Sequence, residues 1–229
     1  MKTIGLIGGT SWVSSMEYYR QFNLLTNKKM GDEDFAKCIL FSLNYGEIEV
    51  LKRKNDDEGI FRILLSASEK LVAAGTDCFA IGANTLHSHA DRLEIEIKLP
   101  FIHIASATAN KIKEKGFSKV GLLGTKATME MSFYKDKLAK SGIKCLVPGE
   151  ADRNFIQQVI SKELIYNQFK NESRMRFIRI IDELNKQGAE GVILGCTEIP
   201  LLVKPEDTKV PLFDTLQIHA EALVDFAIN

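Results

Sequence analysis

Several residue types and sequence patterns are scarce or missing in this chain of 229 residues, and these absences reduce the classes of function that it can have. There are five prolines, one tryptophan and four cysteines. No two cysteines form a CxxC pair, and scattered single cysteines fit free thiols in a reducing compartment better than a disulfide framework or a zinc site. Thirty basic and thirty acidic residues cancel, which gives no reason to expect a nucleic acid or an anionic membrane as partner. We therefore expect a small soluble ligand.

Long apolar runs and nucleotide fingerprints are also missing. No stretch approaches the roughly 20 apolar residues that a membrane helix needs, and Met1-Lys2 leads into a strand-like run without a separate apolar signal segment. The expected location is cytoplasmic. Gly5-x-x-Gly8-Gly9 lacks the GxGxxG spacing, and no GxxxxGK followed by Ser or Thr occurs, so neither a dinucleotide site nor an NTP site is predicted.

Short strand-like runs alternate with helix-periodic stretches along the whole chain. This alternation predicts an α/β fold with parallel sheets and right-handed crossovers. We predict a first doubly wound domain of residues 1–100 plus 212–229 and a second of residues 101–211, with Asp214 capping the last helix and Thr215 as the competing cap. The expected strands are 2–8, 38–43, 78–82, 101–104, 119–124, 144–147, 190–195 and 210–213, and the expected helices are 13–29, 60–74, 106–115, 127–141, 172–187 and 215–228.

The two halves of the chain look alike. The run around Gly5 is echoed around Gly121, and the run ending in Gly82-Ala83 is echoed by the run ending in Gly195-Cys196. The first correspondence has an offset of 121 − 5 = 116 and the second of 196 − 83 = 113, so they agree to within one short loop. We infer an internal duplication; the alternative is that parallel-strand proteins share such Val, Ile and Gly runs by chance.

In open α/β sheets the ligand lies beyond the carboxyl ends of the strands. The residues expected there are rich in hydroxyls, amides and glycines, which suits carboxylates bound by backbone N–H groups and hydroxyls. A thiol at the start of a helix has a lowered pKa, so Cys196 is a candidate base or nucleophile; the alternative is a buried structural cysteine. The strand-end set is Gly8-Gly9-Thr10-Ser11, Asn44-Tyr45, Ala83-Asn84-Thr85, Gly124-Thr125 and Cys196-Thr197-Glu198.

The other cysteines and the histidines are weaker candidates. Cys38, Cys78 and Cys145 fall within strands and are interpreted as packing residues. His87-x-His89-x-Asp91 does not predict a metal site, because side chains two apart on a helix diverge. His87 is still placed to hydrogen-bond a ligand or its own loop, whereas His103 and His219 are interpreted as structural.

The same motifs carry a family resemblance. The segments Ile4 to Trp12, Gly82 to His87 and Gly195 to Glu198, with Phe213-Asp214-Thr215 and the segment from Glu163 to Arg174, resemble the aspartate/glutamate racemase family, in particular its aspartate and broad-specificity amino-acid racemase branch. The resemblance implies two pseudosymmetric α/β domains with the active site between them, no pyridoxal phosphate or metal, and a homodimer.

In that family two residues flank the substrate α-carbon, one removing the α-proton as thiolate and the other returning a proton from the opposite face. The resemblance places Cys196 on one side of the α-carbon and position 83 on the other. It assigns Asn84, Thr85 and Thr197 to the α-carboxylate, with Ser11 and Thr125 as weaker additions. Glu198 and His87 also line the expected site.

The chain departs from the family pattern at Ala83, where members carry cysteine or threonine, because a methyl group transfers no proton. An engineered variant, a natural member with altered activity, and replacement of the acid by water or a nearby hydroxyl all stay open. So do two other functions: a single-cysteine enzyme resembling arylmalonate decarboxylase, acting as a decarboxylase or isomerase of a small dicarboxylate, and a catalytically inactive carboxylate-binding protein.

Aspartate or glutamate as substrate needs a partner for its side-chain carboxylate, and a basic residue is the strong choice. The candidates are Lys52, Arg53, Lys162 and Lys170, all of which also read as solvated surface charges. If none of them reaches the site, a neutral amino acid is the better substrate.

Overall fold

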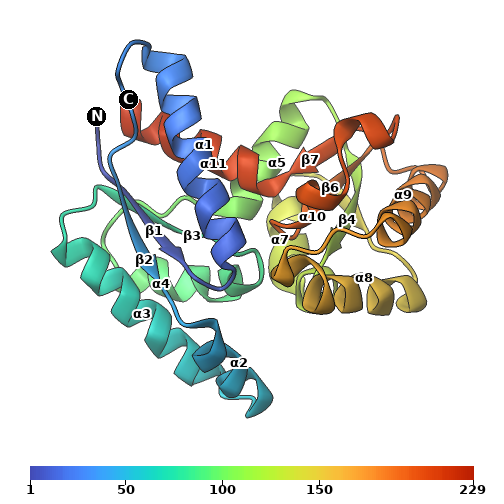
Figure 1. The fold of residues 1–229 in the computed structure, drawn as a ribbon, viewed down its shortest axis with the longest axis horizontal. Helices are drawn as coiled ribbons and strands as arrows, with labels where there is room; N and C mark the ends of the chain where they lie inside the picture. The colour runs from blue at the N-terminus through green and yellow to red at the C-terminus, as the bar shows by residue number, and fades with distance from the viewer. The chain divides into compact units, whose positions relative to one another are not determined.

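The computed structural model describes all 229 residues, which fold into two compact units. Unit 1 comprises Met1–His103 and His219–Asn229, and unit 2 comprises Ile104–Ile218. Each unit contains one parallel sheet with helices packed against it (Figure 1). The predicted α/β fold with two parallel sheets is therefore confirmed.

Unit 1 has a three-stranded sheet of order β2-β1-β3. In Figure 1 its strands lie between helices α1 and α3. Along α3, Ile60, Leu64, Ala67 and Leu71 are buried in the core of this unit, and burial of each larger side chain contributes about 1.5–3 kcal/mol. The elements are β1 Ile4–Gly8, α1 Trp12–Met30, β2 Cys38–Ser42, α2 Tyr45–Arg53, α3 Asp57–Ala73, β3 Cys78–Ile81, the 3₁₀ turn Thr85–His89 and α4 Ala90–Glu96.

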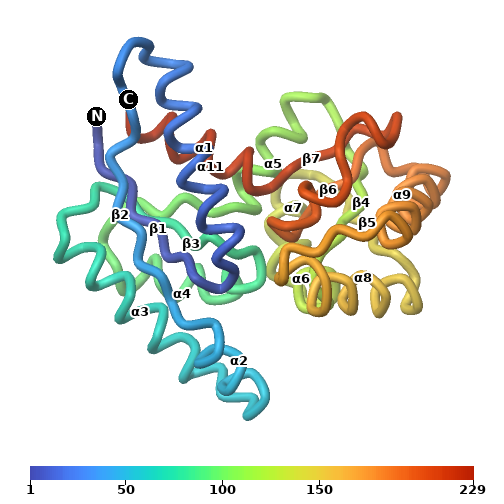
Figure 2. The backbone as a smooth tube through the Cα atoms, viewed as in Figure 1, coloured from blue at the N-terminus to red at the C-terminus, as the bar shows by residue number.

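Unit 2 has a four-stranded parallel sheet of order β5-β4-β6-β7, seen with all its strands labelled in Figure 2. Its core joins the sheet to apolar faces of α5, α7, α8 and α9. The elements are α5 Ile104–Glu114, β4 Lys119–Gly124, α6 Lys126–Glu130, α7 Ser132–Lys140, β5 Lys144–Leu146, α8 Glu150–Lys162, the 3₁₀ turn Leu164–Tyr166, α9 Asn171–Lys186, β6 Gly191–Gly195, α10 Ile199–Leu202, the 3₁₀ turn Pro205–Asp207 and β7 Leu212–Asp214.

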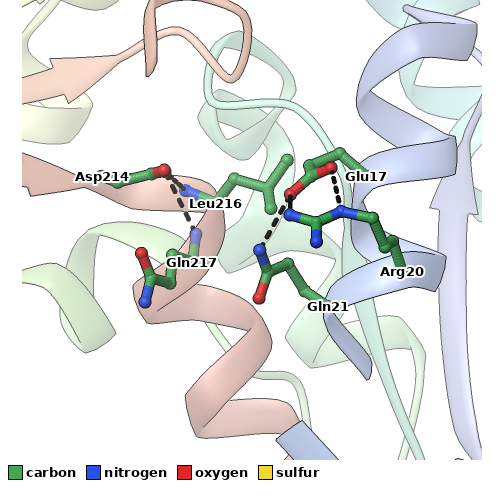
Figure 3. Close-up of polar contacts among 6 residues, drawn as sticks. All are labelled: Glu17, Arg20, Gln21, Asp214, Leu216 and Gln217. Carbon is green, nitrogen blue, oxygen red and sulfur yellow. Dashed lines mark hydrogen bonds and ion pairs between the residues drawn. The ribbon is translucent and has the colours of Figure 1, made fainter. Parts of the chain in front are cut away.

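The last helix, α11 (Thr215–Ile228), begins in unit 2 and ends in unit 1. Asp214 caps it as predicted, because its Oδ1 accepts the backbone N–H groups of Leu216 at 2.9 Å and Gln217 at 3.1 Å (Figure 3). Thr215 instead donates its hydroxyl to the Leu194 carbonyl at 2.9 Å. At the other end, the Lys2 N–H donates to the Ala227 carbonyl at 2.8 Å, so both termini belong to unit 1.

The two sheets repeat one plan. β1 and β4 are central, β2 and β5 follow them on one side, and β3 and β6 pair with them on the other. The strands before Ala83 and Cys196 therefore hold equivalent places in the two units, as the predicted duplication requires. β7 has no counterpart among the strands of unit 1.

Two predicted elements are wrong in detail. The strand expected at 101–104 is a single bridge between Phe101 and Phe79, and α5 already begins at Ile104. The helix expected at 127–141 is broken at Met131, whose backbone is extended. Two helices escaped prediction, 45–53 and 150–162; the first is short, and the second follows Pro148-Gly149, a turn signal that hides its start.

Candidate active site

The two similar loops follow equivalent strands. Within unit 2, Gly124 of β4 pairs with Gly195 of β6, so Thr125 and Cys196 leave the sheet at neighbouring strand ends. Within unit 1, Ile7 of β1 pairs with Ile81 of β3, which brings the loop after β1 beside the loop containing Ala83. Each unit thus gathers its predicted site residues at the carboxyl edge of its own sheet.

Cys196 lies in a buried polar group with the two residues that follow it. Its Sγ donates to Oε2 of Glu198 at 3.0 Å, and the Thr197 hydroxyl donates to the same oxygen at 3.0 Å. Glu198 is 3% exposed, and its other oxygen, Oε1, is buried without a hydrogen-bond partner. The residues expected to bind substrate therefore first bind one another.

The expected lowering of the Cys196 pKa by a helix start is not found in this arrangement. Burial raises the pKa of Cys196 well above its usual range, and the negative charge of Glu198 raises it further, while the backbone N–H groups of Glu198 and Thr197 act in the opposite direction. The helix that follows, α10, has only four residues and starts at Ile199. So short a helix offers little dipole, and the thiol is protonated.

Ala83 opens the equivalent loop in unit 1 and is followed by buried Asn84. Thr85 begins the 3₁₀ turn and is partly buried. The Ala83 carbonyl accepts from Nδ1 of His87 at 2.9 Å, which fixes the proton of that ring on Nδ1. His87 is 2% exposed, and of its two predicted roles this hydrogen bond supports the one of holding its own loop.

Ser11 caps α1, and its Oγ accepts the Ser14 N–H at 3.4 Å. Two further serines in this turn escaped the sequence analysis. Ser15 accepts the Gly9 N–H at 2.8 Å, and Ser14 donates to the Gly82 carbonyl at 3.2 Å, tying this turn to the loop of Ala83. The repeated serines after Gly8-Gly9 were the available signal.

Thr125 caps α6, accepting the Thr128 N–H at 3.2 Å with its hydroxyl. Thr125 lies at the strand edge next to Cys196, and its hydroxyl is 3.0 Å from the Thr128 hydroxyl. A hydroxyl that caps a helix is held in one orientation, which suits recognition of a small polar ligand.

Two of the four candidate cations, Lys52 and Lys170, already form ion pairs with carboxylates of the chain. Lys52, on the last turn of α2, forms an ion pair with Glu49 at 2.9 Å and lies over the Tyr45 ring. Lys170, directly before α9, forms one with Glu163 at 3.3 Å and is 57% exposed at its side chain. To bind a substrate carboxylate, either lysine must leave a carboxylate that it already holds.

Other chemistry is not assembled in the chain. No three His, Cys, Asp or Glu side chains gather where they could hold a metal ion, and no helix is both long and apolar enough to cross a membrane. The distinctive chemical group is a buried thiol that shares a hydrogen bond with a buried carboxylate. Such a pair can accept and return one proton.

Comparison with known proteins shows the family of the chain. The family model described as Asp/Glu/Hydantoin racemase matches residues 7–223. A solved structure from Yersinia pestis, assigned to the Asp/Glu racemases, is 43% identical with a TM-score of 0.93, each chain covered in full. An aspartate racemase homologue from Pyrococcus horikoshii OT3 is 35% identical with a TM-score of 0.88, again with full coverage of both chains.

Among curated proteins, the broad-specificity amino-acid racemase RacX of Bacillus subtilis is 21% identical over 75% of this chain and 74% of its own length. The family match spans nearly the whole chain and includes both similar loops. The predicted family is confirmed: this chain belongs to the Asp/Glu/hydantoin racemase family, whose enzymes work without pyridoxal phosphate.

Proposed function

We propose that the chain moves the α-proton of an amino acid, aspartate or glutamate first, with Cys196 as the acid and base on one face. The observation that carries this proposal is the buried Cys196–Glu198 pair at the end of β6 in a chain of this family. A thiolate there takes the α-proton, and the electron pair left on carbon spreads into the α-carboxylate.

The substrate α-carboxylate is assigned to Asn84, Thr85 and Thr197, with Ser11 and Thr125 as additional donors. These groups offer hydroxyl, amide and backbone N–H donors at strand ends, and donors aimed at the carboxylate stabilise a carbanion-like state. For a dicarboxylic substrate, Lys52 or Lys170 exchanges its present ion pair for the side-chain carboxylate, which costs little because exposed ion pairs contribute only about 0–1 kcal/mol. The proposed assembly is a homodimer.

Ala83 sets a limit on what this chain does. Inversion at carbon needs a proton delivered from the face opposite to Cys196, and a methyl group has none to give. We therefore propose that the chain, as it stands, exchanges the α-proton of one enantiomer with solvent and returns it to the same face. Racemisation is slow or missing.

The test is solvent exchange in deuterium oxide, followed by NMR and chiral chromatography, with L- and D-aspartate and L- and D-glutamate. The present chain should exchange the α-proton of a single enantiomer, Ala83→Cys should racemise both, and Cys196→Ala in either background should remove exchange. If Ala83→Cys is inert on these four and on a wider panel of amino acids, the proposal fails.

A second function is favoured by the same alanine. A single cysteine suffices when the carbanion arises by loss of carbon dioxide instead of by proton removal, because only one face must then be protonated. The chain would act on a small α-substituted malonate. Release of carbon dioxide that depends on Cys196, without α-proton exchange on any amino acid, would select this function.

A further inference from the structure

Glu198 is an unusual carboxylate for its position. Charged side chains are rarely this buried unless a cation pairs with them, yet no ion pair of the chain involves Glu198. Its only hydrogen bonds come from the Cys196 thiol and the Thr197 hydroxyl, both to Oε2, and Oε1 has none. The carboxylate is therefore held against the Cys196 thiol by hydrogen bonds to one oxygen only, and its second oxygen is buried without a partner.

We propose, building on the function proposed above, that Glu198 is the positioning residue that holds the Cys196 proton. The thiol lies 3.0 Å from Oε2, within reach for direct transfer, and the Thr197 hydroxyl fixes that oxygen from a second direction. Glu198 then acts through Cys196 and does not contact the reacting carbon.

The proton balance is simple. In the first step the S–H bond breaks and an O–H bond forms at Oε2, leaving a thiolate beside a neutral carboxyl group. In the second step the substrate Cα–H bond breaks, an S–H bond forms, and the electron pair stays on the α-carbon. One proton and one negative charge remain within the pair during activation, so no charge is brought into the buried site.

A purely electrostatic neighbour would behave differently. The negative charge of Glu198 raises the pKa of the thiol, so replacing Glu198 by Gln lowers that pKa under either interpretation. If Glu198 only discourages ionisation, the variant has more thiolate and works faster. If Glu198 holds the proton, the variant has a more acidic thiol and still works more slowly, because the acceptor is gone.

The first experiment measures iodoacetamide labelling of Cys196 against pH, read from the mass of its peptide. The peptide readout separates it from Cys78 and Cys145, whose pKa values burial raises to about 11. Glu198→Gln should shift the labelling midpoint to lower pH. The control Glu190→Gln removes an exposed carboxylate of the same unit and should leave it in place. An unchanged midpoint in Glu198→Gln overturns the proposal.

The second experiment measures α-proton exchange in deuterium oxide with the same three proteins. Glu198→Gln should lose at least about tenfold in rate, while Glu190→Gln keeps the parent rate. Equal or faster exchange in Glu198→Gln overturns the role of proton holder and leaves the proposed function intact. If the parent chain exchanges no amino acid, the proposed function itself fails, and the role of Glu198 as proton holder fails with it.

Thermal melting checks that each variant is folded. Should Glu198→Gln not fold, Glu198→Asp supplies the comparison, because its carboxylate is one methylene shorter and withdraws from Sγ. Its labelling midpoint should also fall and its exchange should also slow. A midpoint identical to that of the parent chain would count against the proposal.

Discussion

His219 makes the stability of unit 1 depend on pH. It is fully buried, and its Nε2 lies 2.7 Å from the Ile102 carbonyl while its Nδ1 lies 2.8 Å from the Tyr18 hydroxyl. A carbonyl only accepts, so the ring proton sits on Nε2, and Nδ1 accepts from Tyr18. Burial lowers the pKa of His219 to about 4. The folded chain therefore keeps this ring neutral.

The sign and size of this pH effect on the free energy of unfolding follow from the pKa of His219 in the folded and unfolded chain. An unfolded histidine has a pKa of 6.5, against about 4 here, so between these values only the unfolded chain binds the proton. The contribution of His219 is fully present above about pH 6.5 and is lost as pH falls toward 4. At about 1.4 kcal/mol per unit the full loss is roughly 3 kcal/mol, of which about 2 kcal/mol has gone at pH 5.

The assay is urea unfolding at pH 7.5 and pH 5.0, followed by the fluorescence of Trp12, the single tryptophan, which lies on α1 in unit 1. The comparison is His219→Gln, which carries no charge at either pH. Its constant loss of packing cancels when each protein is compared with itself. The parent should lose about 2 kcal/mol more than the variant between the two pH values.

The result that would refute this reasoning is the same pH dependence in parent and variant, within about 0.5 kcal/mol, the usual uncertainty of such comparisons. The same pH dependence in both proteins would mean that a group other than His219 titrates between these pH values. A stronger pH dependence of stability in His219→Gln than in the parent chain would equally contradict the assignment to His219.

Two further changes test the loops and the cap. Gly9 has φ of 86°, and a Cβ there would lie 2.2 Å from the Leu43 carbonyl oxygen, so Gly9→Ala should lower the free energy of unfolding by more than about 1 kcal/mol. The control is Gly31→Ala, because Gly31 has φ of 85° but nothing within 4 Å of an added Cβ, and its loss should be clearly smaller. Equal losses in the two variants would contradict the steric argument. Asp214→Ala should lower the free energy of unfolding in urea by about 1 kcal/mol, because the Leu216 N–H loses its cap. Asp214→Asn should keep most of this stability, since its amide oxygen still accepts that N–H. An unchanged free energy of unfolding in Asp214→Ala would show that the cap is dispensable.

Much of the fold could be predicted from the sequence because the hydrophobic periodicity of each segment matches the helix or strand that it forms in the structure. The strand ending at Ile81 and the apolar face of α3 with Leu64 were predictable from hydrophobic period alone. The apolar run at 101–104 resembles a strand in the sequence, but in the structure only Phe101 pairs, through a single bridge to Phe79. The duplication was visible since equivalent strands end in the same glycine-rich pattern.

The residues of the candidate site could be predicted from the sequence, but the hydrogen bonds among their side chains could not. Cys196, Thr197 and Glu198 were selected by sequence, but their mutual hydrogen bonds depend on side-chain rotamers after the chain turns away from β6. Ser14 and Ser15 were missed because serines after glycines are common in turns. Only the contact of Ser14 with Gly82, 68 residues away, gives it a role.

The sequence by itself determined the parallel α/β class, the doubling and the presence of alanine at position 83 where a proton donor is expected. These are matters of order and periodicity along the chain. Only the tertiary structure decided that Cys196 is a protonated thiol. A pKa depends on burial and on charges a few ångströms away, and it was the fold that buried Cys196 beside Glu198 and left α10 too short to favour the thiolate.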